Sequence, residues 1–448
     1  MTDTGIQRTS AATTKTPHPP TPRQPDEPVF DRRRSWTVLG LIVVFMLINF
    51  ADKAVLGFAA IPLMDELNMS ESTYGLVASA FYLLFNLTGL LVGLISTRMS
   101  SRMILFSLAV GWALAPIPVL LVAAVPTLVV SRMLLGAAEG PASPMSMHAL
   151  YKWFPEGKRA LPTALQIAGG SIGLLLAAPV LAFIITNYGW RAAFIALSVV
   201  AMVWSVLWLR FGQDGPFTAD PAASADGDPT RPRLPYRTLL GNGTVLGGLA
   251  CSFGAYWSMA IAVAWVPAYL ESQVDMTPGG AASVISGKAA LSLVLVLTVV
   301  PLTGVMIRRG VSSRWMRGVV QGTAVTVAGI CMLAFPFVDS TPLCIALAVI
   351  AFGAPTLAYP LGYLTMAEIM PAHQRGAIFG ITLAVSTLPG VIAPFLTGKI
   401  IGWSDSVHAG YQNAFLTAAV VMVIGGLVAI VTVDPPRDAH RLAASSPK

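Results

Sequence analysis

Residues 36–60, WTVLGLIVVFMLINFADKAVLGFAA, form an apolar segment that contains one adjacent pair of charges, Asp52 and Lys53. About 20 predominantly apolar residues are enough for a helix to cross a bilayer. A charge at the centre of such a helix costs about 2.5–3.5 kcal/mol on insertion scales. Two adjacent charges in this segment therefore indicate a functional site inside a spanning helix.

The whole chain has the composition of a membrane protein. Of its 448 residues, 55% are hydrophobic and only 11% are charged, whereas a soluble protein is about 25% charged. The net charge of +7 does not indicate a nucleic-acid partner, because the basic residues alternate with apolar segments and form no single patch. Most of the chain is expected to contact lipid or other helices.

Apolar segments of spanning length recur along the chain in two groups of six. The sequence therefore predicts an all-α membrane protein with twelve transmembrane helices in two six-helix bundles. The predicted parts are a disordered cytoplasmic tail at 1–35, an N-terminal bundle at 36–211, a cytoplasmic central loop at 212–243, a C-terminal bundle at 244–433 and a cytoplasmic tail at 434–448.

Basic residues in the connections predict the orientation, since they are enriched in cytoplasmic loops. Residues 32–34 are all arginine, and basic residues recur after every second span. The opposite loops carry mostly acids such as Glu66 and Glu271, with Arg191 as an exception. Both termini are therefore expected in the cytoplasm, with the protein in the inner (plasma) membrane.

The two halves contain matching basic turns. Residues 93–102 read GLISTRMSSR and residues 304–314 read GVMIRRGVSSR; residues 155–160 read PEGKRA and residues 371–376 read PAHQRG. These matches follow the second and fourth spans of each half. They indicate two related six-span units.

The segment SRMLLGAAEGPASP, residues 131–144, places Arg132 and Glu139 seven residues apart. On a helix they lie ~20° apart on one face, with ~10.5 Å of rise between them. Charges in a spanning helix face the protein interior, so the two residues either orient helices as a pair or give Glu139 a functional use. Gly136, Gly140 and Pro141 predict a close helix approach or a local break beside Glu139.

The four buried charges of the first half, Asp52, Lys53, Arg132 and Glu139, sum to zero. An entering anion would unbalance this set unless a proton arrived with it. A carboxyl group removed from water favours its neutral form, so Glu139 or Asp52 could take up that proton. The hypothesis that follows is proton-coupled entry of an anion.

The second half offers fewer candidates for contact with a substrate. Lys288 either extends its ammonium to the membrane interface or faces the central cavity as a second cation. Trp257 and Trp265 are expected in an aromatic belt at the outer surface. Gln166 and Tyr256 are further candidates for the cavity lining.

The sequence contains no Walker motif, nucleophile elbow, redox pair or metal-ligand spacing. Cys251, Cys331 and Cys344 fall in apolar segments and are expected to be packing residues. No cofactor, no metal and no enzymatic activity are therefore expected.

These residues resemble the anion:cation symporter family of the major facilitator superfamily, which includes bacterial hexonate, hexuronate and aromatic-acid transporters. Residues 49–57, NFADKAVLG, are similar to the family's N-Y-x-D-R pattern. Residues 132–144 are similar to R-x-x-x-G-x-x-E-x-P-x-x-P. The resemblance implies two parallel six-helix repeats and alternating access between them.

The resemblance also implies roles for individual residues. Asp52 and Glu139 would couple transport to the proton gradient, with Arg132 tuning their protonation. Lys53 would bind the substrate carboxylate where the family has an arginine, as a point charge without arginine's planar fork. Phe50 replaces a tyrosine, which suggests a less polar pocket.

The superfamily loop after span two, G-x-x-x-D-R-x-G-x-R, carries an aspartate that is Thr97 here. Arg98 and Arg102 remain, with Arg308 and Arg309 as counterparts in the second half. The resemblance thus implies that these four arginines act in gating, with a weaker acid–base latch.

The resulting prediction is proton-coupled uptake of a small organic anion, such as an aromatic or sugar acid, by a monomer in the lipid bilayer. The alternative is an efflux antiporter for drugs or metabolites. A membrane sensor is disfavoured because the central loop and the C-terminal tail are too short for a signalling domain.

Overall fold

The computed structural model describes residues 31–95, 100–155, 158–217, 235–371 and 374–444. All regular structure in these ranges is helical. Residues 1–30 of the tail predicted at 1–35 lie outside the described residues, as do residues 218–234 of the central loop, whereas residues 32–35 already belong to the first helix. The helices of the N-terminal half are α1 (Arg32–Phe58), α2 (Ala60–Glu66), α3 (Glu71–Ile95), α4 (Ser101–Leu114), α5 (Ile117–Leu121), α6 (Val125–Glu139), α7 (Ala142–Tyr151) and α8 (Ala160–Phe211).

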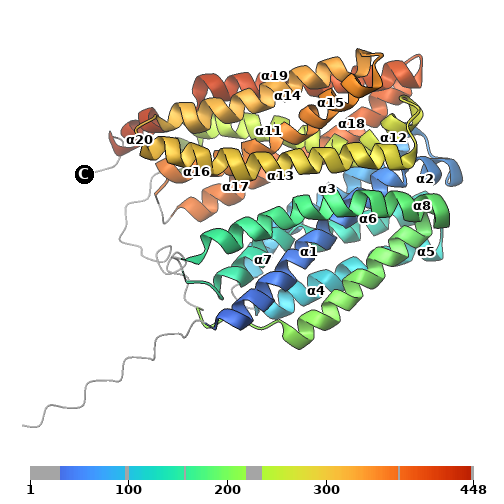
Figure 1. Ribbon diagram of the computed structural model, residues 1–448, viewed down its shortest axis with the longest axis horizontal. Coiled ribbons are helices and arrows are strands. Elements are labelled where there is room, and N and C mark those ends of the chain that lie inside the picture. The colour runs from blue at the N-terminus through green and yellow to red at the C-terminus, as the bar shows by residue number, and fades with distance from the viewer. Residues whose placement is uncertain (1–30, 96–99, 156–157, 218–234, 372–373, 445–448) are drawn as a thin grey trace, which may run out of the picture.

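The C-terminal half forms a second group of helices, drawn in yellow to red in Figure 1. It ends with a short helix beyond the last span. These elements are α10 (Tyr236–Leu240), α11 (Gly243–Ala264), α12 (Val266–Ser272), α13 (Pro278–Arg308), η2 (Arg314–Val319), α14 (Val320–Ala334), η3 (Phe335–Phe337), α15 (Thr341–Gly353), η4 (Ala354–Leu357), α16 (Ala358–Ile369), α17 (Arg375–Thr387), α18 (Pro389–Trp403), α19 (Val407–Thr432) and α20 (Pro435–Ala444).

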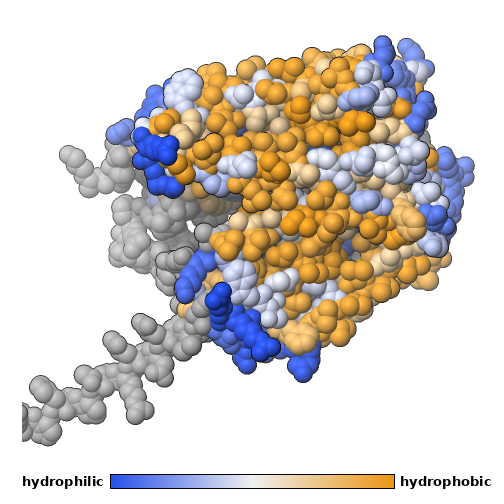
Figure 2. Space-filling model, viewed as in Figure 1, coloured by the Kyte–Doolittle hydropathy of each residue, from blue (hydrophilic) through white to orange (hydrophobic). Residues whose placement is uncertain are grey.

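Nine helical stretches among the described residues are long and apolar enough to cross a membrane. The longest, Leu161–Phe211, turns back at Gly189, whose φ of +81° suits glycine, so α8 contributes two spans (Figure 1). With α3 and the α6–α7 pair, they form the predicted twelve spanning helices in two bundles. Figure 2 shows a mostly apolar face with hydrophilic residues toward its ends, as contact with lipid requires.

Several spans of the two bundles are interrupted, and three of these breaks lie beside the site residues or the contact between the halves. These three breaks fall at Ala59 between α1 and α2, at Gly140–Pro141 between α6 and α7, and at Trp265 between α11 and α12. Pro141 follows Glu139 closely, and a proline removes a backbone donor from a helix. The break expected beside Glu139 is therefore confirmed.

Glycines allow α6 to lie against α3 at very short range. A Cβ added to Gly136 would lie 1.9 Å from the carbonyl oxygen of Phe81, and one added to Gly140 would lie 2.1 Å from that of Phe85. Contacts this short exclude any larger residue without movement of the backbone. The close approach of helices expected from the sequence is confirmed, and it fixes the position of Glu139.

The two halves meet toward the end opposite the C-terminus. Side-chain hydrogen bonds join α3 to the C-terminal half there, from Ser72 Oγ to the Gly398 carbonyl (3.3 Å) and from the backbone N–H of Phe395 to Ser79 Oγ (2.9 Å). Figure 1 shows the bundles together at the α2 and α12 end and separating toward the end with α20. We refer to these as the closed end and the open end.

The hydroxyl of Tyr74 links two broken helices at the closed end. It lies 3.0 Å from the carbonyl oxygen of Leu56 in α1 and 2.8 Å from that of Ala264 in α11. Both carbonyls sit beside a helix break, where intrahelical donors are missing. The Tyr74 hydroxyl is therefore within hydrogen-bond distance of one unpaired carbonyl in each half.

Trp257 and Trp265 do not form an aromatic belt, so that prediction is wrong. Their exposed fractions are 6% and 0%. Trp265 donates its indole N–H to the Pro394 carbonyl (3.1 Å). The centre of its ring lies 4.9 Å from the centre of the Tyr74 ring. Trp265 is buried because the break at this residue places its ring in the contact between the halves.

Each end carries its own polar contacts outside the spans. At the closed end, hydrogen bonds from Arg191 and Trp190 hold the pKa of Glu66 at about 2, below its usual value. At the open end, Asp438 of α20 accepts hydrogen bonds from the N–H and hydroxyl of Thr244, both at 2.7 Å. Although burial alone raises it, these bonds and Arg437 hold the pKa of Asp438 below its usual value.

We expect Gly136→Ala to lower the thermal stability of the purified protein by several degrees, because the new Cβ collides with the Phe81 carbonyl. Overpacking of this kind costs about 1–3 kcal/mol. The control is Gly40→Ala, where an added Cβ meets nothing within 4 Å. Thermal unfolding in detergent measures both, and equal stability of the two variants would contradict the close α3–α6 packing.

Candidate functional site

The centre of the candidate site is an ion pair between Lys53 of α1 and Glu139 of α6. The Lys53 Nζ lies 3.1 Å from Glu139 Oε2, and the side chains are 7% and 0% exposed. Lys53 also donates to Asn49 Oδ1, one turn earlier in α1, at 2.5 Å. The ammonium is thus held away from its sequence neighbour Asp52.

Two aromatic rings complete the surroundings of the Lys53 ammonium. Its Nζ lies 4.8 Å from the ring centre of Phe50 and 5.2 Å from that of Phe85 in α3. A cation over an aromatic face is stabilised by the ring quadrupole, and more so out of water. Phe50, which replaces a tyrosine of the family pattern, therefore contributes a ring face to the site.

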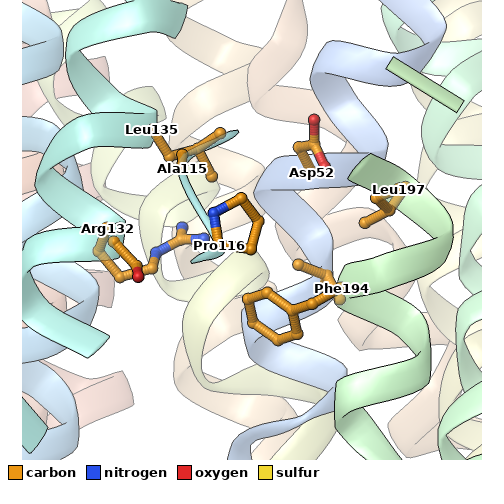
Figure 3. A pocket seen from close by; sticks show the side chains of 9 residues that line it. Asp52, Ala115, Pro116, Arg132, Leu135, Phe194 and Leu197 are labelled. Carbon is orange, nitrogen blue, oxygen red and sulfur yellow. The ribbon is translucent and has the colours of Figure 1, made fainter. Parts of the chain in front are cut away.

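Asp52 and Arg132 line a small cavity inside the N-terminal bundle, together with the apolar side chains of Leu135 and Phe194 (Figure 3). They enter it from different helices, Asp52 from α1 and Arg132 from α6. The guanidinium of Arg132 lies 5.0 Å from the ring centre of Phe81. The structure brings together all four charges that the sequence placed in this half.

Several polar atoms of this charge cluster have no hydrogen-bond partner among the described residues. They include Oδ2 of Asp52, Nε and Nη1 of Arg132 and Oε1 of Glu139. Buried polar atoms are normally paired with protein or water. The cluster therefore has spare capacity for water, a proton or a ligand.

Gln166 and Tyr256 lie in different parts of the molecule. Gln166 of α8 is fully buried and donates to Ser146 Oγ of α7 at 2.9 Å, and its Oε1 has no hydrogen-bond partner in the described ranges. Tyr256 of α11 has its ring edge-on to Tyr82 of α3 at 6.0 Å and to Tyr359 at 6.4 Å. Tyr256 is thus at the contact between the halves.

Lys288 is buried between the halves and does not lie at the surface. It lines a small cavity with residues of α1 and α8 from one half and of α11 and α12 from the other. This burial disagrees with an ammonium that extends to the membrane interface, whereas the second interpretation, a cation that faces the central cavity, stays a prediction.

Of the four predicted gating arginines, Arg102, Arg308 and Arg309 lie at the open end. Arg98 is outside the described residues. Arg102 donates to the carbonyl of Leu209 at the end of α8, and Arg308 and Arg309 are at the exposed end of α13. Ion pairs at this end use other arginines, between Arg314 and Asp434 (3.1 Å) and between Arg317 and Glu368 (3.0 Å).

Sequence reasoning missed Asn49, Tyr82, Phe85 and Tyr359 as neighbours of the site. Asn49 could have been found, since it lies four residues before Lys53 on the same helix face. The three aromatic residues belong to helices whose contacts with α1 and α11 are set only by tertiary packing.

The arrangement suits exchange of one ionic partner for another. A buried ammonium that is paired with a single carboxylate can bind an external anion when that carboxylate is neutralised.

No group of three His, Cys, Asp or Glu side chains able to hold a metal ion occurs in the part of the chain that the structure describes.

A family model described as the Major Facilitator Superfamily matches residues 41–394 and 289–447. The hexuronate transporter of Bacillus subtilis (strain 168) is 24% identical over 411 residues, covering 87% of this chain and 92% of that protein. The D-galactonate transporter of Escherichia coli O6:H1 is 23% identical over 421 residues, covering 90% and 96%. An inward-facing, unoccupied bacterial homolog of the human lysosomal transporter Spinster matches with a TM-score of 0.74 at 15% identity, covering 92% and 98% of the two chains.

We expect Lys53→Met to lower the free energy of unfolding by about 3–5 kcal/mol, because it leaves Glu139 buried without its cation. The double variant Lys53→Met/Glu139→Gln should recover much of that loss. Denaturant unfolding of the single and double variants measures the coupling between the residues.

A matched control is Arg191→Gln, which removes the half-exposed ion pair with Glu66. Exposed pairs contribute up to about 1 kcal/mol, so this variant should unfold close to wild type. If the loss in free energy of unfolding of the double variant equals the sum of the losses of the two single variants, Lys53 and Glu139 do not stabilise each other.

Proposed function

Because this chain belongs to the Major Facilitator Superfamily, we propose that it is a secondary active transporter that takes up a small organic anion together with protons by alternating access. The observation that carries the proposal is the buried ion pair between Lys53 and Glu139. The pair joins the two sequence motifs of the first and fourth spans.

Lys53 is the proposed binding group for the substrate carboxylate. In this structure Glu139 occupies it at 3.1 Å, so an anion must compete with Glu139. A proton on Glu139 removes the competing charge and releases the ammonium for the anion. Binding of anion and proton is then mutually favourable, because each leaves a buried charge that the other compensates.

Asp52 and Arg132 form the second part of the proposed coupling site. Their unpartnered polar atoms border one cavity in the same bundle. Arg132 provides a positive charge near both carboxylates and so sets how readily each takes up a proton. Asp52 is the second proposed proton carrier.

Relatives support an anionic substrate. Two of them are named as transporters of hexuronate and of D-galactonate, and both of these substrates carry a carboxylate. The apolar surroundings of Lys53, with the rings of Phe50 and Phe85, favour an acid with few hydroxyl groups. Gln166 and Tyr256 are proposed as further substrate contacts.

The orientation follows from the basic residues, which gather at the open end. We assign that end and both termini to the cytoplasm of a monomer in the inner membrane. With the closed end outside, the structure corresponds to an inward-facing state. Residues 36–211 and 244–433 are then the bodies that rock against each other, with Arg98, Arg102, Arg308 and Arg309 as gating residues between them.

We expect Glu139→Gln to abolish accumulation of substrate against a gradient while preserving exchange, because glutamine stays neutral and cannot carry a proton. The measurement is uptake of labelled D-glucuronate, D-galactonate and benzoate into proteoliposomes with an acidic exterior. The control is Glu66→Gln, which changes a half-exposed side chain at the closed end. This variant should accumulate the substrates to the same level as wild type.

Normal accumulation by Glu139→Gln would refute the proton role of this residue. Wild-type export driven by the same gradient would instead favour the efflux antiporter. Loss of both accumulation and exchange in a stable Glu139→Gln protein would assign Glu139 to anion binding and contradict a pure coupling role.

A disulfide across the closed end should stop transport if the halves must separate there. A Cβ at Gly402 would lie 3.0 Å from Ser72 Oγ, which suits a disulfide in Ser72→Cys/Gly402→Cys. The native cysteines are buried. Oxidation should block exchange at least tenfold and reduction should restore it, with each single cysteine as control; unchanged exchange in the cross-linked protein would contradict opening at this end.

A further inference from the structure

Lys288 is a buried cation placed between the two halves. It lies ten residues into α13, ~15 Å from the start of that helix, whereas Glu139 lies ~21 Å from the start of α6. Both helices begin at the closed end, so the two residues are at similar depth. The exposed fraction of Lys288 is 9%.

The surroundings of Lys288 offer it no counter-ion. The side chains that line its cavity are apolar, among them Ala54 and Phe58 of α1, Leu174 of α8 and Pro267 of α12. In the described ranges of the chain, no ion pair or hydrogen bond holds its ammonium. Lys53, at comparable depth, has Glu139.

An unpaired ammonium in such a place is costly. Removing an ion from water costs several kcal/mol unless a partner compensates it, and a charge at this depth marks a functional site by default. The buried charged side chains of the first half are two acids, Asp52 and Glu139, and two bases, Lys53 and Arg132. Lys288 therefore leaves the set with one uncompensated positive charge.

The side chains of Lys53 and Lys288 both lie against one stripe of α1. Phe50, Ala54 and Phe58 are spaced four residues apart and so form one stripe of that helix. The Lys53 ammonium lies over the Phe50 ring, and Lys288 faces Ala54 and Phe58. From Phe50 to Ala54 is about one helical turn, ~6 Å along the axis.

This stripe of α1 packs against α8. The Phe50 ring fits against Gly170, where an added Cβ would lie 2.5 Å from the ring. Leu174, one turn further along α8, lines the cavity of Lys288. An apolar strip thus leads from one cation to the other, and the two cations belong to different halves.

We propose that Lys288 is a second anion subsite and that the transported substrate is a short diacid, with one acidic group at Lys53 and the other at Lys288. This inference rests on the proposed function, because it assumes that Lys53 binds a substrate acid. The second acidic group of the substrate is then the counter-ion of Lys288. A diacid that spans the two cations also ties the N-terminal half to the C-terminal half, so its binding favours closure of the bundles around it.

The test compares diacids with monoacids of the same skeleton on the purified full-length protein. The pairs are adipate and hexanoate, isophthalate and benzoate, and D-galactarate and D-galactonate, with malonate to suberate as a length series. Thermal stabilisation by each acid gives its affinity. The second charged contact should make wild type bind the better diacids about ten- to a hundredfold more tightly than their monoacid partners, with one optimum length in the series.

Three substitutions locate the effect. Lys288→Met should remove the preference and leave monoacid affinity within about twofold, whereas Lys288→Arg should keep the preference. Lys399→Met, which removes a cation that contacts Phe395 and Trp403 near the closed end, should change neither affinity. Without ligand, Lys288→Met should unfold at a higher temperature than wild type, because it removes an uncompensated charge.

The outcomes separate this inference from the proposed function. Monoacids that bind as tightly as diacids, or a preference that survives Lys288→Met, overturn the diacid proposal and leave anion transport intact. A ligand-free Lys288→Met protein that unfolds several degrees below wild type overturns the premise that Lys288 lacks a partner. Failure of every acid in the panel to bind wild type overturns the proposed function itself.

Discussion

Lys53 and Glu139 neutralise each other at 3.1 Å in a part of the protein where neither charge would be tolerated alone. The side chains of this pair connect α1 with α6. The carbonyls of α3 approach α6 at Gly136 and Gly140, and the helix breaks directly after the carboxylate. Packing and charge thus depend on each other, because a larger side chain in place of either glycine would move Glu139 away from its partner.

The two halves differ in how their buried charges are compensated. The buried charges of the N-terminal half are two acids and two bases, and unpartnered atoms of Asp52 and Arg132 border a cavity inside the bundle. The C-terminal half contributes Lys288 and a set of tyrosines at the contact. A ligand that supplies negative charge therefore completes the site only where both halves meet, which relates binding to the relative position of the bundles.

The helix breaks provide hydrogen-bond acceptors at the contact between the halves. Each break leaves backbone carbonyls without their intrahelical donors, and Tyr74 serves one such carbonyl from each half. Trp265, at the break between α11 and α12, donates to α18 in the same region. In the proposed transport cycle these bonds would be exchanged for water as the closed end opens.

The sequence by itself determined the spans, the two repeats and the placement of Arg132 and Glu139 on one helix face, because hydrophobic length and helical period are local properties. It also identified the candidate charges, since a charge within an apolar segment is visible without a structure. Only the tertiary structure decided that Lys53 pairs with Glu139 and not with Asp52, that Trp257 and Trp265 are buried, and that Lys288 lies against α1. Neighbours on a helix point ~100° apart, and the partner of each charge comes from a segment far away in the chain, so no local pattern could specify it.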